Sequence, residues 1–148
     1  MTTPSVTDLL SLRDKVAVIT GASQGIGAGI ALRLAEAGAT TVVHYRSNEA
    51  GANAVVDEIR AANGKAIALG ARLEDESATK VFIDQINHKY KSIDVLVNNA
   101  GVFPNKPFLE MSLKDWNDMF SANVDTAFNC SQFTANTMKA AGGGTIVN

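Results

Sequence analysis

Short apolar runs alternate with longer stretches of helical periodicity along the whole chain. The first apolar run, residues 16–19, leads directly into a turn that carries Gly21, Gly25 and Gly27. A short continuous apolar run bounded by glycine is typical of a strand that is buried on both faces of a parallel sheet. Apolar residues at intervals of four follow the turn, so a helix is expected over about 25–37. The chain therefore opens with a strand, a glycine turn and a helix in direct succession.

The same order of elements continues to residue 148. Strands are expected at about 15–20, 40–44, 65–69, 93–97 and from 145, and helices at about 25–37, 49–62, 74–90 and 112–141. Alternating strands and helices indicate a parallel sheet with helices on both faces, and right-handed crossovers make that sheet doubly wound. We therefore predict an α/β, Rossmann-like domain over 15–148, preceded by an irregular lead-in at 1–14. Residues 103–107, which carry two prolines, are predicted to form a loop.

Composition places the chain among ordinary globular proteins. It has 148 residues, of which 46% are hydrophobic and 19% are charged, and a formal net charge of −2. That charge argues against nucleic acid or an anionic membrane as a partner. Cys130 is the only cysteine, so an internal disulfide is excluded and a reducing compartment fits. Because the N-terminus lacks the pattern of a secretory signal and no apolar run is long enough to span a bilayer, we expect a cytoplasmic protein.

The glycine turn reads Thr-Gly-Ala-Ser-Gln-Gly-Ile-Gly over residues 20–27. It differs from the G-x-G-x-x-G dinucleotide fingerprint and from a P-loop. Glycine lets the backbone approach a ligand, and the free N–H groups at the start of the next helix favour a phosphate. Arg46 and Asn98 also follow predicted strands, so they are expected at the same edge of the sheet. A purely structural turn is the alternative, but the strand before and the helix after favour a nucleotide site.

Two motifs in register, residues 20–27 and Asn98-Asn99-Ala100-Gly101, resemble those of the short-chain dehydrogenase/reductase family. The similarity extends from about residue 12 to the end and is greatest to the β-ketoacyl-acyl-carrier-protein reductases and glucose dehydrogenases of its classical branch. The resemblance implies an NAD(P)-dependent oxidoreductase that transfers a hydride between nicotinamide and a small carbonyl or alcohol substrate. It further implies cofactor contacts from Thr20, Gly21, Ser23, Gln24, Gly25, Ile26, Gly27, Tyr45, Asn99, Ala100 and Gly101. Asn98 is expected to make a structural bond to a neighbouring strand instead.

The end of the second strand bears on the choice of cofactor. An acidic side chain there would bind the ribose 2′-hydroxyl of NAD, but no carboxylate occurs between His44 and Glu49. Arg46 can form a charge-assisted fork on a 2′-phosphate, and Ser47 adds a donor. NADP is therefore favoured over NAD. The alternative is that Arg46 is a solvated surface residue, and Gln24 stands where NADP-preferring relatives often carry a basic residue.

Position 72 departs from the family. Relatives usually carry an aspartate after the third strand, and its carboxylate holds the adenine amino group; here Arg72 occupies that place. A guanidinium has donors only, so Arg72 cannot accept that hydrogen bond. Two alternatives remain open. Either Arg72 stacks on the adenine through its planar face, or it points to solvent and Leu73 alone packs beside the ring.

Asn123 matches the asparagine of the family's Asn–Ser–Tyr–Lys set, which bends the long fourth helix and positions a water in the proton relay. The weak helix propensity of asparagine fits such a bend. The Ser and the Tyr-x-x-x-Lys motif do not occur before the last residue, Asn148. The resemblance therefore implies the cofactor-binding half of an oxidoreductase, truncated in or just after the fifth strand, which alone binds cofactor poorly and is inactive. The alternatives are a non-catalytic nucleotide-binding or oligomer-interaction protein, and an unstable fragment without function.

The remaining side chains of interest carry weaker predictions. No metal site is expected, since histidine and cysteine lack ligand spacing. His44 is placed near the cofactor edge or in solvent, His88 on a solvated helix face and Cys130 in the core. The resemblance also implies a homo-oligomer for a full-length protein, with the long fourth helix at the interface. Part of that helix face is expected in the core instead, namely Trp116, Phe120, Phe128 and Phe133.

Overall fold

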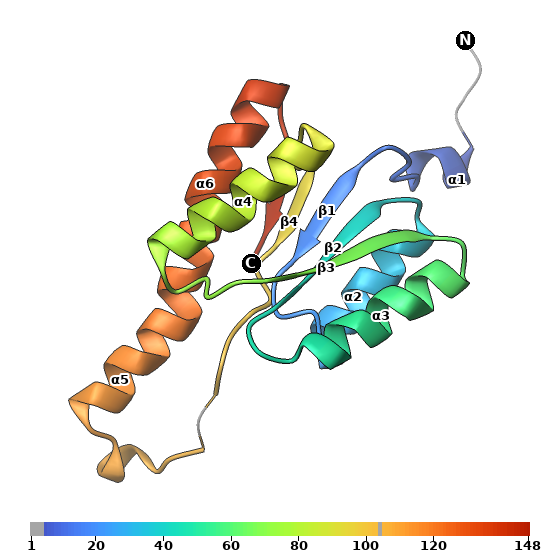
Figure 1. Cartoon of the computed structure of the whole chain (residues 1–148). Helices are drawn as coiled ribbons and strands as arrows, with labels where there is room; N and C mark the ends of the chain where they lie inside the picture. The colour runs from blue at the N-terminus through green and yellow to red at the C-terminus, as the bar shows by residue number, and fades with distance from the viewer. Residues whose placement is uncertain (1–4, 104) are drawn as a thin grey trace.

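The computed structural model describes residues 5–103 and 105–148. Its centre is a five-stranded, fully parallel sheet in the order β3-β2-β1-β4-β5. The strands are β1 (Val16–Ile19), β2 (Thr40–Tyr45), β3 (Lys65–Gly70), β4 (Val95–Val97) and β5 (Thr145–Val147). Helices cover both faces of this sheet (Figure 1), which confirms the predicted doubly wound α/β fold.

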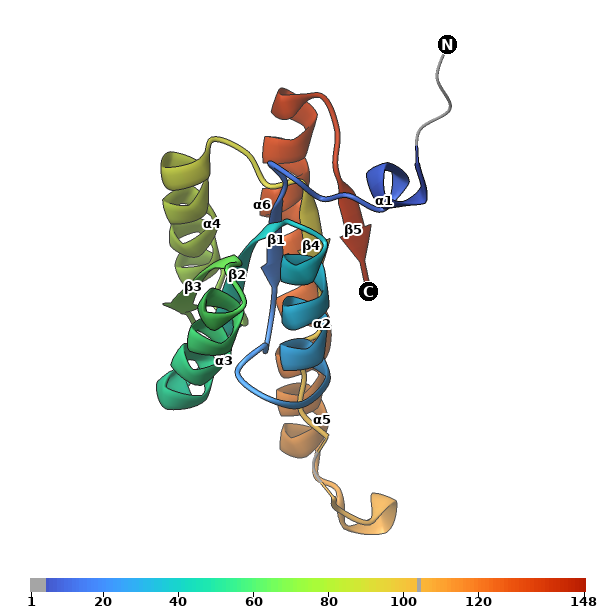
Figure 2. The same ribbon diagram turned by 90° about the vertical axis from the view of Figure 1, so that its right-hand side faces the viewer.

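The helices cover the sheet in two pairs, one on each face (Figures 1 and 2). One pair is α2 (Gly25–Glu36) with α3 (Glu49–Ala61), and the other is α4 (Glu76–Tyr90) with α6 (Thr126–Ala141). Strand β1 shows how the sequence specifies this sandwich. Ala17 and Ile19 pack toward α2 and α3, whereas Val16 and Val18 pack toward α4 and α6. Because successive side chains point to opposite faces, a strand covered on both sides is apolar throughout.

The lead-in is partly helical rather than irregular throughout. Val6–Leu9 form a single turn, α1, whose Asp8 N–H donates to the Ser5 hydroxyl at 3.1 Å. A four-residue turn shows no detectable hydrophobic period, so the sequence pattern missed it. Residues 1–4 of the lead-in, and Pro104 of the predicted loop, lie outside the described residues.

The start of α4 differs from the prediction by two residues. The carboxylate of Asp75 accepts a hydrogen bond of 2.8 Å from the Ala78 N–H, so the helix begins at Glu76. Aspartate is among the preferred residues at a helix N-cap. As a consequence Glu74 stands before the helix, where its side chain can reach the ends of β2 and β3.

The expected helix at 112–141 is three consecutive segments. α5 (Leu113–Phe120) leads into a π-helical segment (Ser121–Asp125) and then into α6. Ser112 starts the run with a capping box: its hydroxyl accepts from the Asp115 N–H at 3.2 Å, and the Asp115 carboxylate accepts from the Ser112 N–H at 2.7 Å. Hydrogen bonds from Lys106 and Ser112 hold the pKa of Asp115 well below its usual range. The predicted bend is therefore the π-helical segment, which contains Asn123.

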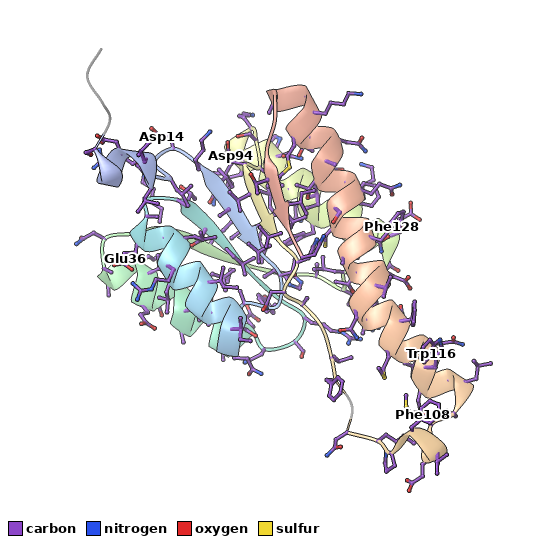
Figure 3. The ribbon with its side chains drawn as sticks, turned by 180° about the vertical axis from the view of Figure 1, so that it is seen from behind. Asp14, Glu36, Asp94, Phe108, Trp116 and Phe128 are labelled. Atoms are coloured by element: carbon purple, nitrogen blue, oxygen red, sulfur yellow. The ribbon has the colours of Figure 1, made fainter. Side chains whose placement is uncertain are left out.

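The expectation that Trp116, Phe120 and Phe128 lie in the core is wrong. Their exposed fractions are 49%, 46% and 60%, and that of Val124 between them is 48%. Figure 3 shows Trp116 and Phe128 on the long helix formed by α5 and α6. Of the four aromatic residues in question, Phe133 alone packs against the apolar cluster under α4 and α6. The spacing of four residues identified a shared helix face correctly, but none of residues 5–103 and 105–148 covers that face.

Candidate nucleotide-binding site

The candidate site lies where the strand order of the sheet reverses. β1 pairs with β2 on one side and with β4 on the other, so the crossovers after β1 and β4 leave in opposite directions. In open α/β sheets, ligands bind at the carboxyl ends of the strands at such a switch point. A cleft of about 490 Å³ occupies this position. It is lined by Gly21, Ser23, Gln24, Gly25, Ile26, Gly27, His44, Arg46, Ser47, Asn48, Ala71, Leu73, Glu74, Asn99, Ala100, Gly101, Val102, Ala122 and Thr126.

The three glycines of the turn are required for different reasons. A Cβ on Gly21, which has φ +63°, would lie 2.8 Å from the Cα of Ala100. A Cβ on Gly27 would lie 2.5 Å from the side-chain nitrogen of Asn99. Gly25 has φ +59° and no atom within 4 Å of the position of a Cβ, so it borders open space in the cleft. Two glycines therefore allow close packing of β1 on β4, and the third leaves room for a ligand.

The start of α2 differs from the starts of the other helices that follow a turn or loop. Side chains of Asn48, Asp75 and Ser112 cap α3, α4 and α5. Among the described residues no side chain caps α2, whose N-cap is Gln24. The first N–H groups of a helix have no partner within it, and the helix dipole gives them partial positive charge. The uncapped end of α2 borders the cleft, so it can bind an anion there.

Thr20 and Asn99 connect the glycine turn to the end of β4. The buried Thr20 hydroxyl accepts hydrogen bonds from the N–H groups of Asn99 at 3.0 Å and Ala100 at 2.9 Å. In return the Asn99 side-chain amide donates to the carbonyl oxygens of Thr20 at 2.9 Å and Gly21 at 3.1 Å. Both N–H bonds of the Asn99 amide are thus used within the protein, so Asn99 shapes the turn as well as lining the cleft.

Asn98 makes structural contacts of the predicted kind. Its backbone N–H donates to Val147 of β5 at 2.8 Å. Its side-chain amide donates to Ser131 at 2.9 Å and to Asn148 at 2.7 Å. Asn98 therefore joins β4 to β5 and α6 and does not line the cleft.

His44 lies at the edge of the cleft, which is the first of its two predicted alternatives, and not in solvent; its hydrogen bonds within the protein were not predicted. Its side chain is only 2% exposed, with one ring nitrogen 3.0 Å from the Gly21 N–H and the other 3.1 Å from the Ala71 carbonyl oxygen. Burial lowers its pKa from 6.5 to about 4. A histidine directly after Val42 and Val43 in a predicted buried strand was the available signal, because a polar ring buried there needs hydrogen-bond partners within the protein.

An ion-paired group of three residues closes the β2 and β3 side of the cleft. One carboxylate oxygen of Glu74, Oε1, forms ion pairs with Arg46 at 2.7 Å and with Arg72 at 3.0 Å. The Glu74 side chain is 19% exposed, compared with 52% for Arg46 and 69% for Arg72. Arg46 is therefore half-exposed and paired, which lies between the two alternatives of a phosphate ligand and a freely solvated side chain.

Asn123 lies beside the segment that follows Gly101. Its amide oxygen accepts from the Val102 N–H at 3.2 Å, and its amide nitrogen donates to the Val102 carbonyl at 3.0 Å. The same nitrogen donates to the Met119 carbonyl at 2.8 Å. This last bond takes the carbonyl that the Asn123 backbone N–H would use in an α-helix, which accounts for the π-helical segment at this point.

The cleft brings together twelve of the predicted cofactor residues: Gly21, Ser23, Gln24, Gly25, Ile26, Gly27, Arg46, Ser47, Leu73, Asn99, Ala100 and Gly101. Four other predicted site residues do not line it, namely Thr20, Tyr45, Arg72 and Asn123. Tyr45 packs over Gly70, where a Cβ would lie 2.8 Å from the ring, and Arg72 lines an adjoining hollow. His88 is exposed and Cys130 is buried, as predicted, and burial raises the pKa of the Cys130 thiol to about 12.

Comparisons with known proteins agree with this geometry. A family model described as short chain dehydrogenase matches residues 15–148. The chain belongs to the short-chain dehydrogenase family. It is 38% identical over 134 residues to the 3-oxoacyl-[acyl-carrier-protein] reductase FabG of Staphylococcus aureus. The aligned region covers 90% of this chain and 54% of that protein. The chain thus spans about half the length of the curated relatives it matches.

Solved structures of the same family have the same fold. A short-chain type dehydrogenase/reductase from Mycobacterium marinum superimposes with a TM-score of 0.92 and 37% identity, covering 97% of this chain and 58% of that one. A gluconate 5-dehydrogenase from Burkholderia cenocepacia, in complex with NADP and tartrate, gives a TM-score of 0.87 and 33% identity, covering 96% and 55%. These similarities make the chain part of an NAD(P)-binding family of oxidoreductases.

Two further properties concern only residues 5–103 and 105–148. None of their helices is both long and apolar enough to cross a bilayer. Within the same part of the chain, no three His, Cys, Asp or Glu side chains come together in a way that could hold a metal ion.

Proposed function

We propose that this chain is the cofactor-binding half of an NADP-dependent oxidoreductase that transfers a hydride between nicotinamide and a carbonyl or alcohol substrate. The observation that carries the proposal is the uncapped start of α2 beside the open space at Gly25. A dinucleotide pyrophosphate supplies the anion that such a helix end favours. Gly21, Ser23, Gln24 and Ile26 would surround that pyrophosphate, with the backbone of the turn as the main source of donors.

NADP is preferred over NAD because of the side chains at the end of β2. Arg46 and Ser47 both line the cleft. Arg46 can donate two charge-assisted hydrogen bonds to a 2′-phosphate, and Ser47 can donate one from its hydroxyl. The Burkholderia cenocepacia structure in complex with NADP supports this choice. Leu73, which is 2% exposed, would pack beside the adenine.

The other end of the cleft would take the reacting part of the cofactor. The cleft after β4 is lined by one amide side chain, that of Asn99, and by the small residues Ala100 and Gly101. These residues would let the nicotinamide ribose lie close to the sheet. The nicotinamide supplies or accepts the hydride. Asn123, which holds the chain just beyond Gly101, would act in the proton relay of the catalytic set. Neither Tyr45 nor Tyr90 is followed by a lysine at the fourth position, so this chain alone is expected to bind cofactor without reducing a substrate.

A second copy of the chain is the proposed protein partner, and the cytoplasm the proposed location. The exposed apolar face formed by Trp116, Phe120, Val124 and Phe128 supports a homo-oligomer, since contiguous apolar patches mark interfaces. Light scattering after gel filtration tests this: Phe128→Glu should lower the mass to that of one chain, and an unchanged mass would refute it. The net charge of −2 and the single cysteine support a cytoplasmic protein without nucleic acid or membrane partners.

Cofactor binding is tested by thermal melting of the 148-residue protein with NADPH and, separately, with NADH. A ligand that binds only the folded state raises the melting temperature as its concentration rises. NADPH at millimolar concentration should raise it more than NADH does, and Arg46→Asp should reverse that order. No rise with either cofactor would refute nucleotide binding. In the same samples, oxidation of NADPH by a panel of ketones above the protein-free rate would refute the expected inactivity.

A further inference from the structure

Two arginines from neighbouring strands meet at one carboxylate oxygen beside the cleft. β2 and β3 are adjacent and parallel, with Tyr45 paired with Gly70, so the residues that follow each strand emerge side by side. The Arg46 guanidinium forms an ion pair with Oε1 of Glu74 at 2.7 Å, and Arg72 donates hydrogen bonds to the same atom through two nitrogens, at 3.0 and 3.2 Å. Three guanidinium nitrogens thus converge on a single anionic oxygen.

The charges of this group are unbalanced. Two guanidinium groups face one carboxylate, which leaves one positive charge in excess. The Arg46 and Arg72 side chains are at least half exposed, so their ends are accessible to a ligand, while Glu74 is largely buried between them. A phosphate dianion would match both arginines, and its oxygens accept the same charge-assisted hydrogen bonds as a carboxylate.

We propose that Arg46 and Arg72 together bind the 2′-phosphate of NADP, and that Glu74 competes with that phosphate for them. This inference rests on the proposed NADP dependence. It adds Arg72 as a second residue that binds the phosphate and Glu74 as a carboxylate that competes with the phosphate. Arg72 then neither stacks on the adenine nor points freely to solvent. Glu74 lines the cleft and is negatively charged, like the phosphate. The phosphate must therefore replace Glu74 in its contacts with the two arginines, so Glu74 lowers the affinity for NADP.

The test is a fluorescence titration of the protein with NADPH and with NADH. Arg72→Gln should weaken NADPH binding roughly fivefold, the scale of a partly exposed charge-assisted contact, and leave NADH within about twofold. Glu74→Gln should tighten NADPH binding by a similar factor, because it removes both the competitor and a repulsive charge. Arg33→Gln and Glu36→Gln are matched controls, since these residues form an exposed ion pair of 2.5 Å near the other end of α2. Neither control should change either affinity.

The outcomes separate this inference from the proposed cofactor. If Arg72→Gln leaves NADPH binding unchanged, or weakens NADPH and NADH equally, Arg72 is not a phosphate ligand and the proposal is wrong. If Glu74→Gln weakens NADPH binding, Glu74 orients the arginines and does not compete. Both results are compatible with an NADP preference that depends on Arg46 alone. If the unmodified protein binds NADH as tightly as NADPH, the NADP dependence itself fails and this inference fails with it.

Discussion

The imidazole of His44 accepts a hydrogen bond of 3.0 Å from the backbone N–H of Gly21, the first glycine of the turn. A backbone N–H can only donate, so this ring nitrogen, Nδ1, must be unprotonated. The other nitrogen, Nε2, lies 3.1 Å from the Ala71 carbonyl oxygen, which can only accept, so it must carry the proton. His44 is therefore neutral and held in one tautomer, and it ties the glycine turn to the ends of β2 and β3.

This relationship predicts a pH dependence of stability. The folded-state pKa of His44 is lowered from 6.5 to about 4, mainly by burial. Between these values the unfolded chain binds a proton that the folded protein does not, so stability falls as the pH decreases from 6.5 toward 4. The contribution is fully present above pH 6.5, and its loss by pH 4 amounts to about 3 kcal/mol. Urea denaturation at half-unit intervals of pH measures it.

The matched control for that measurement is His44→Asn, which offers an acceptor but does not titrate. The variant is expected to start less stable at pH 7 and to lose about 3 kcal/mol less than the wild type on acidification. His88→Asn, at an exposed position, should leave the wild-type profile unchanged. Parallel curves for the wild type and His44→Asn would show that the buried imidazole does not control the acid sensitivity.

Alanine substitution at Gly25 should affect both stability, through backbone strain, and NADPH binding, through contact with the ligand; a matched substitution at Gly142 should affect stability alone. Gly25 and Gly142 both have positive φ, +59° and +92°, and open space where a Cβ would lie. Alanine at either position should cost roughly 1–2 kcal/mol of stability, because L-residues disfavour this conformation. Only the Cβ at Gly25 would enter the cleft, so Gly25→Ala should also weaken NADPH binding by about tenfold, or ~1.4 kcal/mol. Equal NADPH affinities in the two variants would contradict a phosphate contact at Gly25.

Much of the fold was predictable because each strand and helix has its own characteristic spacing of apolar residues. A strand covered on both faces must be apolar, as at Val16–Ile19, and glycine must stand where a Cβ would strike Ala100 or Asn99. The apolar run is visible in four consecutive residues, and the glycines are visible as a motif, although the side chains that require them lie far along the chain. The family motifs then identified the cleft around the turn, which the structure assembles at the switch point of the sheet.

The rest depends on distances between separate elements. Periodicity placed Trp116, Phe120 and Phe128 on one helix face but could not show that this face stays exposed in the part of the chain that the structure describes. Likewise, Arg72 is only two residues from Glu74, but nothing local indicates that Arg46 reaches the same carboxylate, because that approach depends on the register of β2 with β3. The tautomer of His44 also follows from partners that lie 23 and 27 residues away.

Removal of the Thr20 hydroxyl is predicted to destabilise the folded protein. It is fully buried, and its oxygen accepts from the N–H groups of Asn99 and Ala100. Thr20→Val keeps the shape but leaves the Ala100 N–H without its acceptor, whereas the Asn99 N–H keeps the Val97 carbonyl at 3.1 Å; the change should cost about 1–3 kcal/mol. Thr20→Ser keeps the hydroxyl and should cost about 1 kcal/mol, for the lost methyl group. Chemical denaturation of both variants measures the difference, and a valine variant as stable as the serine variant would refute the role of the hydroxyl.

The effects of substitutions at Gly101, after β4, and at Asn123, in the π-helical segment, on the free energy of unfolding are predicted to be strongly coupled. A Cβ on Gly101 would strike the amide oxygen of Asn123, which three hydrogen bonds hold in place. Gly101→Ala should therefore cost on the order of 2 kcal/mol, the usual penalty of overpacking. Asn123→Ala removes the obstacle together with its own hydrogen bonds and should cost about 1–2 kcal/mol.

The double variant tests that coupling directly. Once Asn123 is alanine, the added methyl group at position 101 meets no amide oxygen, so the two losses should not add. We expect the double variant to be about as stable as Asn123→Ala, with a coupling energy of roughly 2 kcal/mol, the full cost of Gly101→Ala, in a double-mutant cycle from urea denaturation. Gly142→Ala combined with Asn123→Ala is the control pair and should be additive, because Gly142 lies at the far end of α6. Additive losses for Gly101 and Asn123 would mean that the side chain of Asn123 is free to move aside, and that it does not fix the chain beside the cleft.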